Sequence, residues 1–117
     1  MDMSNVENRD SLMELPSGTT LSNGKYIIEN KIGEGGFGIT YRAIQVGLNR
    51  VVCIKEYFIA GKCSRNTRLK TVVPQENPER FEKYRLAFVR EARMLGGLKH
   101  SNIVEVIDVF DENNTSY

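Results

Sequence analysis

The stretch that decides the fold is IGEGGFGIT, residues 32–40, in which glycines recur at Gly33, Gly35 and Gly38. Glycines at this spacing let backbone N–H groups approach phosphate oxygens, and they allow turn conformations that other residues avoid. The same spacing also occurs in dinucleotide-binding folds and in plain flexible turns. The loop alone therefore leaves three interpretations open.

The residues around the loop favour strands. A dinucleotide fold needs a helix directly after the glycines, whereas residues 39–41 are β-branched or aromatic and Gly47 comes too soon for a helix. Residues 26–32 and 50–58 also have the composition of strands. We therefore predict an antiparallel meander in which the glycine loop is a flap over phosphates. Phe37 at its tip either shields those phosphates or packs on its own lobe.

The second half of the chain predicts one main helix. Asn77 followed by Pro78 is a favourable N-cap and first-turn pair. Apolar residues then recur at helical spacing until the glycines at 96–97, which end the helix. Beyond them, residues 103–110 predict a fourth strand, and residues 111–117 predict a turn followed by the start of a fifth strand.

Two segments lack a regular pattern. Residues 1–22 are rich in polar side chains and predict a flexible N-terminal tail, so that the ordered lobe spans residues 23–117. Residues 59–77 predict a polar loop long enough to be an insertion, with a short strand at Val72 and Val73. Its basic part, residues 62–70, is interpreted as a solvated segment, with a phosphosite or a docking segment as alternatives.

Composition excludes several classes of protein. The 117 residues are 40% hydrophobic and 26% charged, as in ordinary globular proteins, and sixteen basic residues nearly balance fifteen acidic ones. We therefore expect no nucleic-acid partner, and the absence of a long apolar run predicts no membrane segment and a cytoplasmic protein. Cys53 and Cys63 should be reduced, and with His100 they are too few to build a zinc site.

Two charged residues lie among apolar neighbours. Lys55 shares one face of the predicted third strand with apolar residues, and Glu91 lies beside the apolar stripe of the helix without an oppositely charged neighbour three or four positions away. A Lys55–Glu91 pair would satisfy both charges and hold the ammonium group toward phosphates. The alternatives are a lysine whose stem reaches water and a solvated Glu91. Spacing alone leaves the pair open.

These motifs follow the order of the protein-kinase signatures. IGEGGFGIT, VCIK at residues 52–55, Glu91 in the helix and HSNIV at residues 100–104 resemble them over about residues 23–117. The resemblance is to the bacterial, eukaryotic-type (Hanks-type) Ser/Thr kinases. It implies an α+β fold, a protein-kinase-like small lobe in which a twisted antiparallel sheet packs against one main helix, the C helix.

The resemblance also implies roles for single residues. The backbone of the glycine loop covers the phosphates of ATP, Lys55 contacts the α and β phosphates, and Glu91 pairs with Lys55. Ile32, Thr40 and Cys53 roof the adenine, and Thr40 and Cys53 stand at positions where valine and alanine are common. The implied catalytic residues are Lys55 and Glu91, no metal ligand is implied, and the implied nucleotide-binding residues are Ile32, Gly33, Glu34, Gly35, Gly36, Phe37, Gly38, Thr40, Cys53 and Lys55.

Phosphoryl transfer by a kinase also needs an Asp in an HRD-like loop, an Asn, and the Asp of a DFG motif that binds Mg²⁺. None of these motifs is present in the 117 residues. We therefore expect an N-terminal lobe truncated before the hinge and the C-terminal lobe, inactive alone, with Mg²⁺ bound only when the second lobe is present. The expected partners are ATP, the protein substrate of the full-length kinase, and a second copy of the lobe. The alternative is a non-catalytic pseudokinase or regulatory module.

Overall fold

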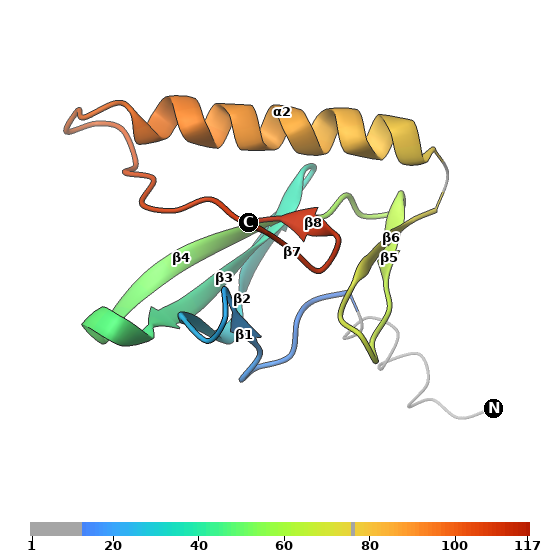
Figure 1. Ribbon diagram of the computed structural model, residues 1–117, viewed down its shortest axis with the longest axis horizontal. Helices are drawn as coiled ribbons and strands as arrows, with labels where there is room; N and C mark the ends of the chain where they lie inside the picture. Colours follow the sequence, from blue (N-terminus) through green and yellow to red (C-terminus); the bar gives the residue numbers. More distant parts are fainter. Residues whose placement is uncertain (1–12, 76) are drawn as a thin grey trace.

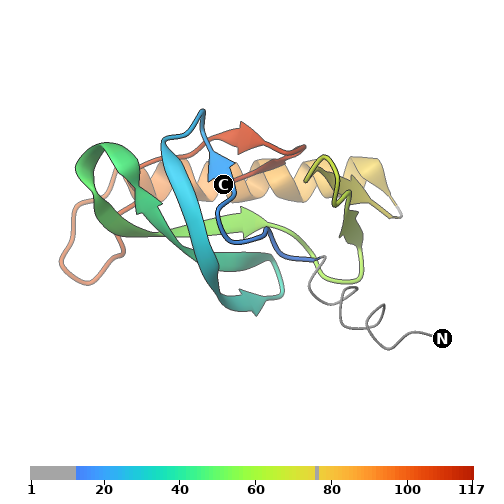
Figure 2. The same cartoon turned by 90° about the horizontal axis from the view of Figure 1, so that it is seen from below.

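The computed structural model describes residues 13–75 and 77–117. A strongly twisted antiparallel sheet lies on one side of a long helix (Figures 1 and 2). The strands of this sheet follow one another in the order of the sequence: β1 (Thr20–Leu21), β2 (Tyr26–Gly35), β3 (Gly38–Gln45) and β4 (Arg50–Tyr57). The predicted fold class, an antiparallel sheet packed by one main helix, is confirmed.

The β2–β3 hairpin carries the glycine loop. Gly35 pairs with Gly38, so that only Gly36 and Phe37 form the turn between the strands. Strand β3 then pairs with β4 over its whole length, with Thr40 opposite Lys55. A short 3-10 helix, η1 (Val46–Leu48), connects β3 to β4. The predicted meander is therefore present, and its register places the loop at the same end of the sheet as Lys55.

Alternation along β3 builds the core. Ile39, Tyr41 and Ala43 are buried, as expected for successive positions on one face of a strand. Residues from β2 and β4 pack against the same face, among them Ile28 and Ile54. The sheet therefore has one face buried in this core, and its other face carries Thr40, Cys53 and Lys55.

The predicted boundary between a flexible tail at residues 1–22 and the lobe is wrong for residues 13–22. Leu15 and Leu21 are buried, and β1 pairs with β2. The Gly18 N–H donates to the Ile28 carbonyl at 2.8 Å. Two isolated leucines in a polar stretch have no periodicity, so only their tertiary contacts reveal that they belong to the core. Residues 1–12 lie outside the described residues.

Helix α2 (Pro78–Gly96) has the predicted bounds. The Asn77 side chain caps its first turn, accepting hydrogen bonds from the N–H groups of Glu79 and Arg80 at 3.0 and 3.1 Å. Phe81 and Val89 are buried, and the rest of the helix is more exposed. Among the described residues, no helix is long and apolar enough to cross a membrane.

The predicted fourth strand at residues 103–110 is wrong. Within the described part of the chain no residue of this segment is in a strand, and it crosses between α2 and the sheet in an irregular course. Only at its end does Phe110 exchange backbone hydrogen bonds with Tyr117, at 3.1 and 2.8 Å. An alternating pattern favours a strand only where a neighbouring strand supplies hydrogen bonds. Val104, for example, remains 84% exposed. The four-stranded sheet is completed at its other edge by β1, which pairs with β2.

The last residues form a tight hairpin. Strand β7 (Asp111–Glu112) pairs with β8 (Thr115–Ser116) through Asn113 and Asn114, both with positive φ. Asparagine tolerates this left-handed conformation better than most residues, which explains why the chain turns here. The strand predicted to begin at residue 115 is confirmed. The observed turn, Asn113 and Asn114, is shorter than the predicted turn at residues 111–114, because Asp111 and Glu112 belong to β7. Strand β8 contacts both α2 and β4.

The insertion between β4 and α2 contains a second hairpin. Strand β5 (Cys63–Arg65) pairs with β6 (Val72–Pro74) at one end of the helix. The short strand predicted at Val72 and Val73 is therefore confirmed. The basic segment 62–70 is not uniformly solvated, because the Arg65 side chain is only 1% exposed.

Candidate functional site

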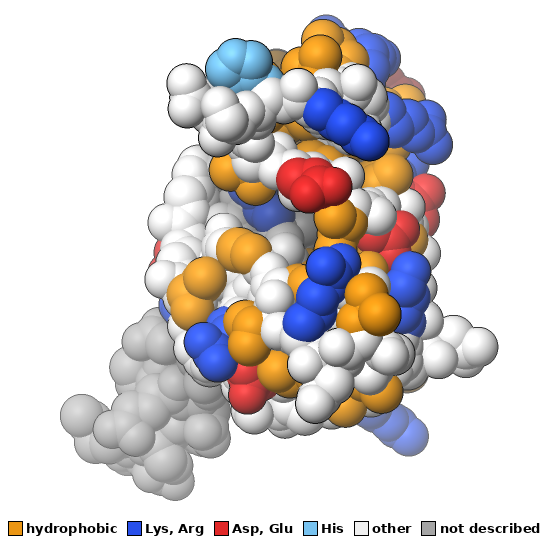
Figure 3. Space-filling model, turned by 90° about the vertical axis from the view of Figure 1, so that its left-hand side faces the viewer, with side chains coloured by type: hydrophobic (Ala, Val, Ile, Leu, Met, Phe, Trp, Pro, Cys, Tyr) orange, Lys and Arg blue, Asp and Glu red, His pale blue; other side chains and the backbone are white. Residues whose placement is uncertain are grey.

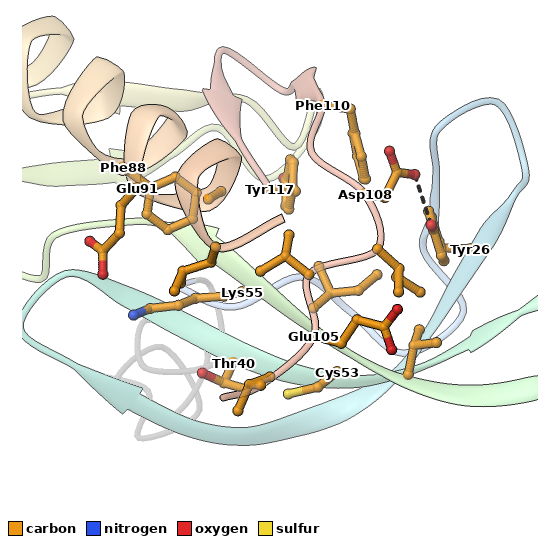
Figure 4. Close-up of a pocket in the computed structure, with 17 residues that line it drawn as sticks. Tyr26, Thr40, Cys53, Lys55, Phe88, Glu91, Glu105, Asp108, Phe110 and Tyr117 are labelled. Carbon is orange, nitrogen blue, oxygen red and sulfur yellow. Dashed lines mark hydrogen bonds between the residues drawn. The ribbon is translucent and has the colours of Figure 1, made fainter. Parts of the chain in front are cut away.

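A pocket of about 360 Å³ opens between the sheet and α2. Figure 4 shows four of the predicted site residues around it: Thr40 and Cys53 lie on the sheet side, Lys55 extends from β4, and Glu91 comes from α2. Aliphatic and aromatic side chains supply most of the remaining wall. The pocket thus combines an apolar floor with one cation and one carboxylate that come from opposite elements.

Lys55 and Glu91 share this pocket without forming an ion pair. Figure 4 shows the ammonium group and the carboxylate at the same end of the cavity. Both residues are exposed, and neither has a charged partner among the described residues. Alternation along β4 explains the direction of Lys55, because its neighbours Ile54 and Glu56 point into the core. The structure brings the two residues together and leaves their predicted pairing as a prediction.

The glycine loop lies outside this pocket. Gly36 and Phe37 instead line a smaller pocket of about 240 Å³ beside the N-terminal end of α2. Ile32 and Phe37 are 57% and 64% exposed, so neither is packed into the lobe. The structure therefore does not support the interpretation that Phe37 packs on its own lobe.

The glycines of the loop differ in the space around them. A Cβ on Gly33, Gly35 or Gly36 would have no atom within 4 Å, whereas a Cβ on Gly38 would lie 2.4 Å from the carbonyl oxygen of Glu56. Gly38 is therefore required by close backbone packing at the base of the loop. The other three glycines leave the surface of the loop open.

The segment 104–108 also lines the pocket. It is anchored by Asp108, whose Oδ2 accepts hydrogen bonds from the Tyr26 hydroxyl at 2.8 Å and from Lys25 Nζ at 3.1 Å. Burial acts to raise the pKa of Asp108, but these two donors outweigh it and hold the pKa below its ordinary value. Sequence reasoning assigned no role to this segment at the pocket, because it expected a strand there.

Sequence reasoning also missed a buried polar cluster directly behind Lys55. The Glu56 carboxylate is completely buried, and it accepts hydrogen bonds from Arg65, Tyr41 and Tyr117. Burial and the charge of Glu56 raise the pKa values of both tyrosines far above the ordinary range, so that they remain donors. The only signal in the sequence is a glutamate at a position where strand alternation predicts an apolar residue.

Helix α2 is anchored to the C-terminal hairpin by Arg85. Its guanidinium contacts Glu82 on the same helix at 2.5 Å, and Asp111 and Ser116 on the hairpin at 3.2 and 2.7 Å. The ring of Tyr57 on β4 also packs against Phe88 on α2, with ring centroids 5.7 Å apart. These contacts set the position of the helix that carries Glu91.

The charges elsewhere are distributed without a dominant sign. Figure 3 shows basic and acidic side chains interspersed with hydrophobic ones on the face that it presents. Among the described residues, no group of three or more His, Cys, Asp or Glu side chains could hold a metal ion.

Comparisons with known proteins find kinases. The chain is 37% identical over 87 residues to cyclin-dependent kinase 1 of Encephalitozoon cuniculi, covering 74% of this chain and 23% of that protein. It is 34% identical over 100 residues to a probable serine/threonine-protein kinase of Clostridium acetobutylicum, covering 86% and 12% of the two chains. The chain thus spans less than a quarter of the length of these relatives. No family model matches the sequence.

One solved structure has the same fold. It is the apo form of PpkA-294, with a TM-score of 0.81 and 33% sequence identity, and the match covers 88% of this chain and 36% of the other. Serine/threonine-protein kinase PknK of Mycobacterium tuberculosis is likewise 36% identical over 80 residues, 68% of this chain and 6% of that protein.

Proposed function

Since this chain is, by its fold and its sequence similarity, the N-terminal lobe of a eukaryotic-type protein Ser/Thr kinase, we propose that its cleft binds ATP. The whole protein would transfer the γ-phosphate to a serine or threonine of a protein substrate. The observation that carries this proposal is the meeting of Lys55 from β4 and Glu91 from α2 at one pocket, where the cation has no partner within the described residues.

We propose that different residues of the chain bind different parts of ATP. Lys55 donates to the α and β phosphates, and Glu91 pairs with its ammonium group once the nucleotide is bound. The backbone from Gly33 to Gly38 covers the phosphates, which need close approach to N–H groups. Ile32, Thr40 and Cys53 contact the adenine.

The chain supplies only part of what phosphoryl transfer requires. Its residues bind and orient the nucleotide, and the site for Mg²⁺ and the catalytic Asp are supplied by residues outside these 117. We propose that the chain alone has no kinase activity and binds ATP weakly. Calorimetry with ATP and Mg²⁺ tests this proposal, and tight, magnesium-dependent binding would contradict it.

The central experiment uses the whole protein of which this chain is the lobe. Replacement of Lys55 by methionine should lower phosphate transfer from radiolabelled ATP to a protein substrate by about 100-fold or more, because a cation placed at developing charge is removed. Lys83→Met is the matched control, since Lys83 is an exposed lysine on α2 that does not line the pocket.

Two outcomes would change the conclusion. Full activity of the Lys55→Met variant would refute the role of the cleft. Nucleotide binding without any transfer by the unmodified whole protein would favour the alternative, a non-catalytic pseudokinase or regulatory module.

A further inference from the structure

A completely buried ion pair lies directly behind the cleft. Glu56 Oε1 accepts from Arg65 Nη2 at 2.5 Å and from the Tyr41 hydroxyl at 2.8 Å, and Glu56 Oε2 accepts from the Tyr117 hydroxyl at 2.5 Å. The side chains of Glu56 and Arg65 are 0% and 1% exposed. Both carboxylate oxygens are therefore satisfied without water.

The guanidinium of Arg65 is held from several sides. Its Nε donates to the Met13 carbonyl at 3.0 Å, its Nη1 donates to the Lys70 carbonyl at 2.9 Å, and it lies 5.1 Å from the centre of the Phe58 ring. A planar guanidinium group that donates to all of these acceptors is fixed in one orientation. The ammonium group of a lysine could not make the same set of hydrogen bonds. One side chain thus connects the inserted hairpin, the N-terminal segment and strand β4.

Such a cluster restricts geometry more than it adds stability. Desolvation of two charges offsets most of their attraction, and an apolar replacement of similar volume is often as stable. A charge left without its partner in the core is strongly unfavourable, however, so that the cluster permits only the arrangement in which every donor and acceptor is used.

Strand β4 transmits this constraint to the cleft. Glu56 follows Lys55, and the alternation of the strand sends one side chain into the core and the other into the pocket. The carbonyl of Glu56 is also the group that excludes a Cβ at Gly38, where the glycine loop rejoins β3. The same residue therefore touches the base of the loop through its backbone and the buried cluster through its side chain.

We propose that Arg65, acting through Glu56, is a positioning residue for Lys55 and the glycine loop. The inserted hairpin β5–β6 is then part of the nucleotide-binding machinery, although it does not touch the pocket. This inference rests on the proposed function, because it concerns the geometry with which Lys55 meets phosphate.

The test compares three variants of the 117-residue chain by NMR, with and without ATP. Arg65→Lys keeps the positive charge but removes the planar guanidinium group. Tyr117→Phe removes one hydroxyl donor to Glu56 and leaves the aromatic ring in place. Arg42→Gln is the matched control, because it breaks an exposed ion pair between Arg42 on β3 and Glu29 on β2, at 2.8 Å, away from the buried cluster. The readouts are the amide signals of Lys55 and Gly38, the dissociation constant for ATP, and the thermal midpoint.

Arg65→Lys should move both amide signals and weaken ATP binding by about tenfold or more, since small misplacements of a binding group carry large losses. Tyr117→Phe should move the same signals in the same direction by less, and Arg42→Gln should leave them unchanged. If Arg65→Lys does not fold, the result for Tyr117→Phe decides.

The proposal is overturned if the variants lower the thermal midpoint while the signals of Lys55 and Gly38 and the ATP affinity stay within twofold of the Arg42→Gln control. A failure of the proposed function would give a different experimental result. In that case the unmodified chain shows no binding of ATP, whereas the amide signals of the free variants still report whether Arg65 positions Lys55.

Discussion

Replacement of Gly38 by alanine tests the packing at the base of the glycine loop. The added Cβ would lie 2.4 Å from the Glu56 carbonyl oxygen, whereas such contacts are essentially never shorter than 3.0 Å. The obstacle is backbone of the paired strand β4, at the loop end of the β3–β4 ladder, so that the strands must separate there by at least about 0.6 Å. Overpacking of this kind costs about 1–3 kcal/mol. At this chain length, the melting temperature should fall by about 4 °C for each kcal/mol.

Gly36→Ala is the matched control within the same loop. No atom lies within 4 Å of a Cβ built at Gly36, and its φ is not in the left-handed region. We expect its free energy of unfolding to stay within about 0.5 kcal/mol of the unmodified chain. Urea unfolding followed by circular dichroism measures both variants. Equal stabilities of the Gly38→Ala and Gly36→Ala variants would refute the argument that close packing, and not loop flexibility, requires the glycine at position 38.

Two further predictions concern titration and reactivity. The pKa of Asp108 is lowered, so its contribution to stability is present above its unfolded pKa near 3.8 and is lost as the pH falls through the lower folded value. Tyr26→Phe removes one of the two hydrogen-bond donors to Asp108. The difference in urea midpoint between this variant and the unmodified chain should therefore narrow below about pH 4. A difference that stays constant with pH would contradict this role of Asp108. At pH 8, Ellman's reagent should modify exposed Cys53 in the folded chain and Cys63 only after unfolding, because burial limits access to Cys63 and raises its pKa to about 11. Rapid modification of two thiols in the folded protein would be the contrary result.

Several features could be predicted from the sequence because their causes are local. The glycine loop is a turn between strands since β-branched and aromatic residues flank it. Helix α2 begins after Asn77 because the cap and Pro78 are adjacent in the chain, and it ends at the glycine pair. The periods of the strand and the helix placed Lys55 and Glu91 beside apolar residues but left their pairing open, and the folded chain brings both to one pocket.

The errors arose where local pattern and tertiary partners disagree. Residues 103–109 alternate like a strand, but no neighbouring strand pairs with them in the described chain, and residues 104–108 line the pocket instead. Leu15 and Leu21 lie in a polar stretch and are nevertheless buried. A strand needs a neighbouring strand to pair with, and a core residue needs other segments to pack around it. Both depend on distant parts of the chain, so a local pattern does not predict them.

The sequence by itself determined the family of the fold, the glycine flap, and the strand and helix that carry Lys55 and Glu91, because short-range periodicity and caps specify such elements. Only the tertiary structure decided how Lys55 is held. Glu56 meets Arg65 nine positions away and Tyr117 sixty-one positions away, and no local pattern relates the three. A buried charge takes its partners from whichever segments the folded chain brings beside it, and this is why the cluster behind the cleft appears only in three dimensions.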